Sequence, residues 1–252
     1  DLRMSRGLGD VYKRQNLKSN SIMIKAVLFD FDETLQDRTS AFDKYTDAFT
    51  AEFMPNLSGE EKQKRRDDMV RTGNGGYAER NTWFSGLIKM WDWKNSPGAT
   101  ALTNHYEENF GKYCIIFDDA IPLLKELHKR NIKTGIITNG PSVLQHTKLD
   151  NSGLLPYCDI TVVSGDYDFA KPQAQIFLYT AAQLGLKPEE CLYVGDHPVN
   201  DIEGALGAGM KAVRMNWGWF KDKNLRPDVP VVNKLYDCLL YTSPSPRDMR
   251  RS

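Results

Sequence analysis

The stretch IKAVLFDFDETL, residues 24–35, decides the fold. It opens with a short apolar run, Ile24 to Phe29, and continues into two carboxylates, Asp30 and Asp32. An apolar run of this length that ends in acidic residues is typical of a buried strand in a parallel sheet. Two residues apart in an extended chain, Asp30 and Asp32 point the same way, so one can act as an ionised nucleophile and the other as a proton carrier. Taken alone, the pair could equally be a solvated acidic turn.

The rest of the chain alternates predicted strands with predicted helices. Further strands are predicted at 132–138, 160–163, 191–194 and 211–215, and helices at 119–130, 173–184 and 200–208. This alternation predicts βαβ units and an α/β fold with a parallel sheet. Residues 37–117 differ, because strand signals are few and helical patterns occur at 41–53, 58–71, 77–91 and 100–113. We call residues 37–117 the helical insertion.

Three more polar motifs follow predicted strands. Thr138 and Asn139 end the second strand, and their hydroxyl and backbone N–H groups could hold phosphate oxygens. Lys171 could balance a phosphoryl group as a point charge. Asp196 and Asp201 follow a later strand and suit a hard cation. Each motif alone is weak, but ligands of open α/β sheets bind at the carboxyl ends of the strands, so together they predict a phosphate and divalent-cation site.

The order and spacing of these four motifs, from about Ile24 to Met215, strongly resemble the haloacid dehalogenase superfamily of phosphotransferases. The resemblance is to subfamily I members that carry a helical cap between the first two motifs. It implies a Rossmann-like, doubly wound parallel sheet, with a catalytic core at 23–36 and 118–237 and an α-helical cap at 37–117. It also implies a phosphatase that is phosphoglycolate-phosphatase-like or nucleotidase-like, acting on a small phosphomonoester.

The resemblance assigns the chemical steps to the first motif. Asp30 would attack phosphorus and form an aspartyl-phosphate. Asp32 would protonate the leaving oxygen and then activate water, while its backbone carbonyl binds the metal. The charge of Asp30 is expected to help keep Asp32 protonated.

The same resemblance assigns binding roles to the other three motifs. Thr138, the backbone of Asn139 and Lys171 would hold the phosphoryl oxygens. Asp196, with Asp30, would ligate Mg²⁺, and Asp201 would support the cation or Lys171 without ligating it directly. The metal and Lys171 would offset the repulsion between a carboxylate nucleophile and an anionic phosphate.

Three alternatives to a phosphatase stay open. A phosphomutase would use the same four motifs. A 2-haloacid dehalogenase would use Asp30 but has no evident need of Asp32 or of a metal ligand at Asp196. A non-catalytic regulatory domain would use Asp30 only as a phosphoacceptor, against which the intact Asp32 and Asp201 and the large insertion argue.

Substrate choice is expected to reside in the helical insertion. Arg80 and Asn81 could contact a second polar group of the substrate, and Trp83 and Trp93 could stack on a base. Packing is the favoured role for the two tryptophans, as it is for the aromatic residues Phe42, Tyr45 and Phe49. Outside the insertion, His197 is expected to be a loop side chain, and Trp217 and Trp219 to pack or to touch the insertion.

Composition limits the partners. Lys plus Arg and Asp plus Glu each number 33, so the net charge is zero and gives no electrostatic case for nucleic acid or an anionic membrane. No apolar run approaches the roughly 18 residues of a membrane span. Four cysteines without a CxxC motif favour a reducing cytoplasm. We therefore expect a cytoplasmic monomer or homodimer whose partner is a small molecule.

The two ends differ from the rest of the chain. Residues 5–15, SRGLGDVYKRQ, and 238–248, CLLYTSPSPRD, can be encoded by one DNA segment read in opposite directions, and both resemble translated sequencing adapter. We expect segments 1–22 and 238–252 to be artefacts, poorly ordered and without function, and Met23 to be the natural start. Both segments are net basic, so the chain between them is net acidic.

Overall fold

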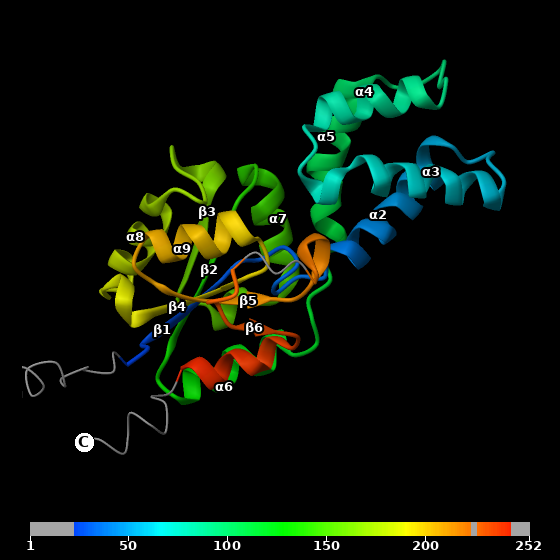
Figure 1. Cartoon of the computed structure of the whole chain (residues 1–252). Helices are drawn as coiled ribbons and strands as arrows, with labels where there is room; N and C mark the ends of the chain where they lie inside the picture. The colour runs from blue at the N-terminus through cyan, green and yellow to red at the C-terminus, as the bar shows by residue number, and fades with distance from the viewer. Residues whose placement is uncertain (1–22, 223–225, 243–252) are drawn as a thin grey trace, which may run out of the picture.

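The computed structural model describes residues 23–222 and 226–242. They form a six-stranded parallel sheet with helices on both faces, and a group of helices that projects from one end of it (Figure 1). The strands are β1 Ala26–Phe29, β2 Lys133–Thr138, β3 Ile160–Val163, β4 Cys191–Gly195, β5 Lys211–Met215 and β6 Val231–Val232. All five predicted strands are present, and β6 is an edge strand too short to predict. The segments 1–22 and 243–252 lie outside the described residues.

The strand order is β3-β2-β1-β4-β5-β6, so the chain builds outward from β1 in one direction and then in the other. The doubly wound α/β fold predicted from the sequence is confirmed. In such sheets the strand order reverses at one point, here between β1 and β4, and a crevice opens there at the carboxyl ends of the strands. The first and fourth sequence motifs follow these two strands.

The side chains of β1 show why it lies at the centre of the sheet. Ala26 and Leu28 belong to the apolar core on one face, and Val27 and Phe29 to the core on the other. All four are fully buried, and burying a large apolar side chain contributes about 1.5–3 kcal/mol. One face is covered by α6 (Ala120–Lys129) and α7 (Ser142–Ser152), and the other by α8 (Ala174–Gln183), a π-helical segment (Pro198–Glu203) and α9 (Gly204–Gly207).

Among the described residues, α7 is the one α-helix of the core that the sequence did not predict. Its buried apolar residues are only Leu144 and Leu149, while the polar side chains of Gln145 and Lys148 are also buried. Val143 in its first turn is exposed. The helix therefore lacks the apolar stripe by which an amphipathic helix is recognised.

The helical insertion has a separate apolar core, to which Leu144 of α7 also contributes. Its helices are α2 Arg38–Phe53, α3 Gly59–Thr72, α4 Arg80–Met90 and α5 Ala99–Asn109, followed by a 3-10 turn at Phe110–Tyr113. The predicted capping box is present, since Ser58 and Glu61 exchange side chain-to-backbone hydrogen bonds at the start of α3. Tyr45 and Phe49 are fully buried in this core, which confirms their packing role.

Residues 238–242 correct the expectation of a disordered tail. A 3-10 segment, Leu235–Tyr241, packs under α6, and Cys238 and Leu239 are buried in the core on that face. These apolar side chains cover part of α6 that water would otherwise reach, which explains why the segment is ordered. Within the described ranges, no helix combines the length and the apolar character needed to cross a membrane.

Candidate active site

All seven predicted site residues line one cavity of about 450 Å³ at the carboxyl ends of the strands. Asp30 directly follows β1, Thr138 is the last residue of β2, and Asp196 directly follows β4. The Asp30 backbone N–H donates to the Val194 carbonyl at 2.8 Å, which fixes the start of the first motif against β4. The parallel sheet thus brings the first motif next to motifs that lie more than 100 residues further along the chain. The other wall of the cavity belongs to the helical insertion.

Lys171 is the positive centre of the cavity floor. Its Nζ donates to Asp30 Oδ1 at 2.5 Å, to Asp201 Oδ1 at 2.7 Å and to the Tyr193 hydroxyl at 3.1 Å. Its side chain is only 3% exposed. Burial by itself lowers the pKa of an ammonium group, but the charges of Asp201 and Asp30 outweigh it and hold the pKa of Lys171 above its usual value. Lys171 is therefore a permanent cation.

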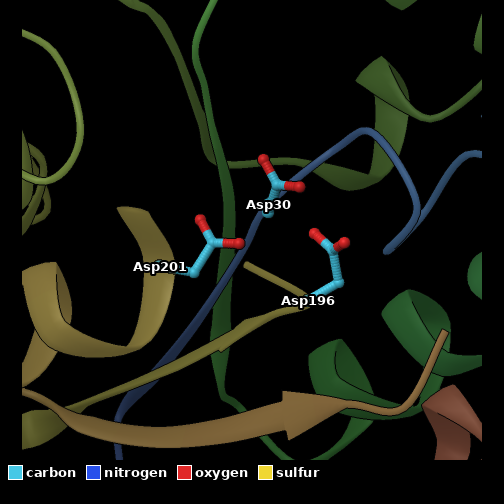
Figure 2. A group of neighbouring side chains, drawn as sticks. All are labelled: Asp30, Asp196 and Asp201. Atoms are coloured by element: carbon cyan, nitrogen blue, oxygen red, sulfur yellow. The ribbon is translucent and has the colours of Figure 1, made fainter. Parts of the chain in front are cut away.

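Three buried carboxylates lie close together beside Lys171, and Figure 2 shows their side chains. Asp30, Asp196 and Asp201 each place an oxygen within 4.8 Å of the other two. Burial raises the pKa of Asp30 to about 7, against the opposing charge of Lys171 and with further repulsion from Asp201. Burial, followed by repulsion from Asp201 and Asp30, raises the pKa of Asp196 well above its usual value. Lys171 alone thus leaves negative charge unbalanced at this point.

This carboxylate group fits a hard divalent cation such as Mg²⁺. The donors are oxygens of the type that Mg²⁺ prefers, and the raised pKa values mark charge that a cation would neutralise. Asp201 is already engaged through both oxygens, because Oδ1 accepts from Lys171 and Oδ2 accepts from the His197 backbone N–H at 2.9 Å. Asp30 and Asp196 are therefore the side chains best placed to ligate such a cation, while Asp201 binds Lys171.

Asp32 lies in a different electrostatic setting from Asp30. Lys148 Nζ donates to both of its carboxylate oxygens, at 2.8 and 2.9 Å, Gln145 Nε2 donates to Oδ2 at 3.2 Å, and Arg38 Nε lies 3.9 Å from Oδ1. Burial raises the pKa of Asp32, but Lys148, Arg38 and these hydrogen bonds together bring it below the usual value. The expectation that the charge of Asp30 keeps Asp32 protonated is therefore wrong, because nearby cations outweigh it.

The residues around Asp32 were not predicted from the sequence. Gln145 and Lys148 lie on the unpredicted helix α7, and Arg38 is the first residue of α2. Their one sequence signal is the three-residue spacing of Gln145 and Lys148, which places both on one helix face just after the Thr138 turn. Such a polar pair is far more often solvent-exposed than buried, so the spacing alone would not have identified them.

Thr138 and Asn139 differ in what they offer a substrate. Thr138 Oγ1 accepts a hydrogen bond from Gln145 Nε2 at 2.5 Å, so its own proton can be donated into the cavity. The Asn139 side chain instead holds the third motif, since Oδ1 accepts from the Lys171 N–H at 2.9 Å and Nδ2 donates to the Lys171 carbonyl at 2.8 Å. This leaves the backbone of Asn139, rather than its side chain, for a phosphoryl oxygen.

The insertion side of the cavity is aromatic and cationic. Of the four predicted specificity residues, Arg80 and Trp83 line it, whereas Asn81 and Trp93 are not among the described lining residues. The Arg80 guanidinium lies 4.8 Å above the ring of Tyr106 and donates to backbone carbonyls. Trp83 is also packed in the core of the insertion, which bears out its expected packing role.

The core contributes two aromatic contacts to the same wall. Trp219 lines the cavity and approaches Gly75 so closely that a side chain on that glycine would overlap its ring, so Trp219 does touch the insertion as predicted. His197 Nδ1 accepts from the backbone N–H groups of Val199 and Asn200, and its ring lies 5.3 Å from that of Tyr77. His197 is thus a loop side chain that caps a helical turn.

Comparisons with known proteins agree with this geometry. A family model described as a haloacid dehalogenase-like hydrolase matches residues 24–209. The glyceraldehyde 3-phosphate phosphatase of Methanopyrus kandleri is 32% identical, over 83% of this chain and 91% of that protein. The pyrimidine 5'-nucleotidase YjjG of Escherichia coli is 31% identical, over 75% of this chain and 85% of that protein.

A solved structure extends the likeness to three dimensions. The magnesium-bound HAD-hydrolase YfnB of Bacillus subtilis is 26% identical with a TM-score of 0.67, and the match covers 88% of this chain and all of that one. The family model spans the core motifs and the insertion alike. The chain therefore belongs to the haloacid dehalogenase-like hydrolases, the superfamily that the order and spacing of its four motifs resemble.

Proposed function

We propose that this protein is a Mg²⁺-dependent phosphatase that hydrolyses a small phosphomonoester through an aspartyl-phosphate on Asp30. The observation that carries the proposal is the buried arrangement in which Lys171 bridges Asp30 and Asp201, with Asp196 beside them, under a cavity open to a ligand. The relatives of this chain that are more than 30% identical include phosphatases and a nucleotidase, which supports a phosphoric monoester hydrolase over a dehalogenase or a mutase.

The first half of the reaction forms the aspartyl-phosphate. A carboxylate oxygen of Asp30 attacks phosphorus in line with the leaving oxygen, while Lys171 and the Thr138 hydroxyl bind the other phosphoryl oxygens. Mg²⁺ held by Asp30, Asp196 and the Asp32 backbone carbonyl would supply the positive charge that lets the two anions approach. Asp32 gives a proton to the departing oxygen, so the product leaves as an alcohol.

The second half returns the enzyme to its starting state. Asp32, now a carboxylate, takes a proton from water, and the resulting hydroxide attacks phosphorus and releases phosphate from Asp30. The lowered pKa of Asp32 favours this ionised form, and it also makes Asp32 a ready donor whenever it carries the proton that the first half needs. Asp201 keeps Lys171 in place throughout, because it binds that ammonium at 2.7 Å.

The helical insertion at 37–117 is proposed to act as the cap that selects the substrate. It supplies the aromatic residues and the Arg80 guanidinium that face the cavity opposite the carboxylates. A cavity of about 450 Å³ suits a sugar phosphate or a nucleoside monophosphate. Sugar phosphates and pyrimidine nucleotides are also the substrates that the names of the relatives state.

The test is phosphate release from a panel of esters, with Mg²⁺ and with EDTA. The panel contains glyceraldehyde 3-phosphate, ribulose 1,5-bisphosphate, a pyrimidine nucleoside 5'-monophosphate, phosphoglycolate and p-nitrophenyl phosphate. We expect Mg²⁺-dependent turnover of at least one ester, abolished in Asp30→Asn. Asp43→Asn is the matched control, because Asp43 also lines the cavity but is exposed. Turnover that survives in Asp30→Asn, or in EDTA, would refute the proposal, and isomerisation without phosphate release would indicate a mutase.

A further inference from the structure

Lys148 is a buried cation in the cavity wall, and both of its short contacts with carboxylate oxygens are to Asp32. Its side chain is 2% exposed, and its Nζ lies 2.8 and 2.9 Å from the two oxygens of that carboxylate. Among the described residues, no other carboxylate lies within ion-pair distance of Lys148. Burying an ammonium group costs several kcal/mol unless it is well paired, so the Lys148–Asp32 contact is the interaction that compensates its burial.

The ammonium group of Lys148 has little room to move. It lies 5.2 Å above the ring of Phe110, in the last turn of the helical insertion. The neighbouring Gly111 approaches α7 so closely that an added Cβ would lie 3.1 Å from the Lys148 backbone nitrogen and 2.8 Å from Thr147 Cγ2. Lys148 is thus held between the core and the insertion, and the carboxylate it binds is held with it.

Each of the two cavity lysines binds one carboxylate of the first motif. Lys171 binds Asp30, the proposed nucleophile, on the floor of the cavity. Lys148 binds Asp32, the proposed proton carrier, and spans both of its oxygens. A carboxyl group held through both oxygens cannot rotate about its last torsion angle, so its direction toward a leaving oxygen is set before substrate binds.

We propose that Lys148 is a positioning residue that holds the Asp32 carboxyl in line with the leaving group, an inference that rests on the proposed phosphatase function. When the ester P–O bond breaks, the Asp32 O–H bond breaks too, and its proton passes to the departing oxygen to form an alcohol. The electron pair of that O–H bond stays on Asp32, and the resulting carboxylate pairs with Lys148 in the geometry seen here. Lys148 gains and loses no proton in either half of the reaction.

The experiment compares two esters that differ in how much they need a proton donor. Phenyl phosphate releases a weakly acidic phenol, whereas p-nitrophenyl phosphate releases a more acidic one that departs without protonation. Because kcat/KM reports steps up to departure of the phenol, Lys148→Met is expected to lower it about 100-fold for phenyl phosphate and less than about 10-fold for p-nitrophenyl phosphate. Lys112→Met is the matched control, since Lys112 is exposed and its one hydrogen bond to a described side chain is to Asn109.

A double-mutant cycle separates positioning from direct binding. If Lys148 acts only through Asp32, the double variant D32N/K148M has the same kcat/KM as D32N alone. Removing both charges leaves neither Lys148 nor Asp32 as an unpaired buried ion, so the double variant is expected to fold even where Lys148→Met does not. Lys148→Arg keeps the charge and can bridge two carboxylate oxygens, and it is expected to recover part of the activity on phenyl phosphate.

Two outcomes overturn the inference while the wild-type protein remains an active phosphatase. Equal losses on both esters, or losses that add to those of D32N, would mean that Lys148 binds substrate directly or only supports the fold. A wild-type protein that releases no phosphate from either ester or from the wider substrate panel with Mg²⁺ would instead refute the proposed function. The two failures are therefore distinguishable.

Discussion

We expect the ionised carboxylate of Asp30, the proposed nucleophile, to lower the free energy of unfolding of the protein. Burial, only partly opposed by Lys171, raises the pKa of Asp30 from 3.8 to about 7. A carboxyl whose pKa is higher in the folded than in the unfolded state favours folding when protonated, and that stability is lost as the pH rises from about 4 through about 7. At about 1.4 kcal/mol per pKa unit, the loss between pH 4 and pH 8 is about 4 kcal/mol without metal.

Asp30→Asn removes this ionisation and retains the shape of the side chain. In EDTA at pH 8 we expect the variant to be more stable than wild type by about 2–4 kcal/mol, and at pH 4 to differ by less than about 1 kcal/mol. The measurement is urea unfolding at both pH values, with Asp43→Asn as the control for an exposed carboxylate in the same cavity.

Mg²⁺ adds a second arm to this experiment. A ligand that binds only the folded state stabilises it by about 2.7 kcal/mol at 100 times its Kd. Mg²⁺ at pH 8 is expected to stabilise wild type and to have little effect on Asp30→Asn. The reasoning would be refuted by an Asp30→Asn protein that is no more stable than wild type at pH 8, or by a stability difference that is the same at both pH values.

Three further substitutions test the packing and the site. Gly135→Ala puts a methyl group about 2.6 Å from Ile160 Cγ2, and we expect a loss of about 1–3 kcal/mol in urea unfolding. Asn139→Ala removes two hydrogen bonds to the Lys171 backbone, so kcat/KM and the free energy of unfolding should both fall, the latter by about 1–3 kcal/mol. Arg80→Ala should raise KM about 10-fold or more for an ester with a second anionic group and leave that for p-nitrophenyl phosphate unchanged, as steady-state kinetics would show.

The catalytic motifs could be predicted from the sequence because each lies within a few residues of a strand end. Once the strands are recognised, the parallel sheet itself places Asp30, Thr138 and Asp196 at one edge. Local patterns also sufficed for the helices of the insertion, where aromatic residues recur at helical spacing and Ser58 and Glu61 form a capping box. These features depend only on residues that are close together in the sequence.

The setting of Asp32 could not be predicted in the same way. Its partners Gln145 and Lys148 lie 113 and 116 residues away, on a helix whose buried face is partly polar. Sequence reasoning places buried lysine and glutamine at the surface by default, since most are exposed. It therefore missed α7, and with α7 the cations that lower the pKa of Asp32.

The helical insertion leaves and rejoins the core through two adjacent segments. The Asp37 N–H donates to the Ile115 carbonyl at 2.8 Å, and the Phe117 N–H donates to the Leu35 carbonyl at 3.0 Å. The two ends of the insertion are therefore held together at the sheet, and the residues between them form a closed loop. Doubling the length of a flexible loop costs only about 0.6 kcal/mol in closure entropy. This junction would let helical modules of different size be exchanged between relatives while β1 and its carboxylates keep their register.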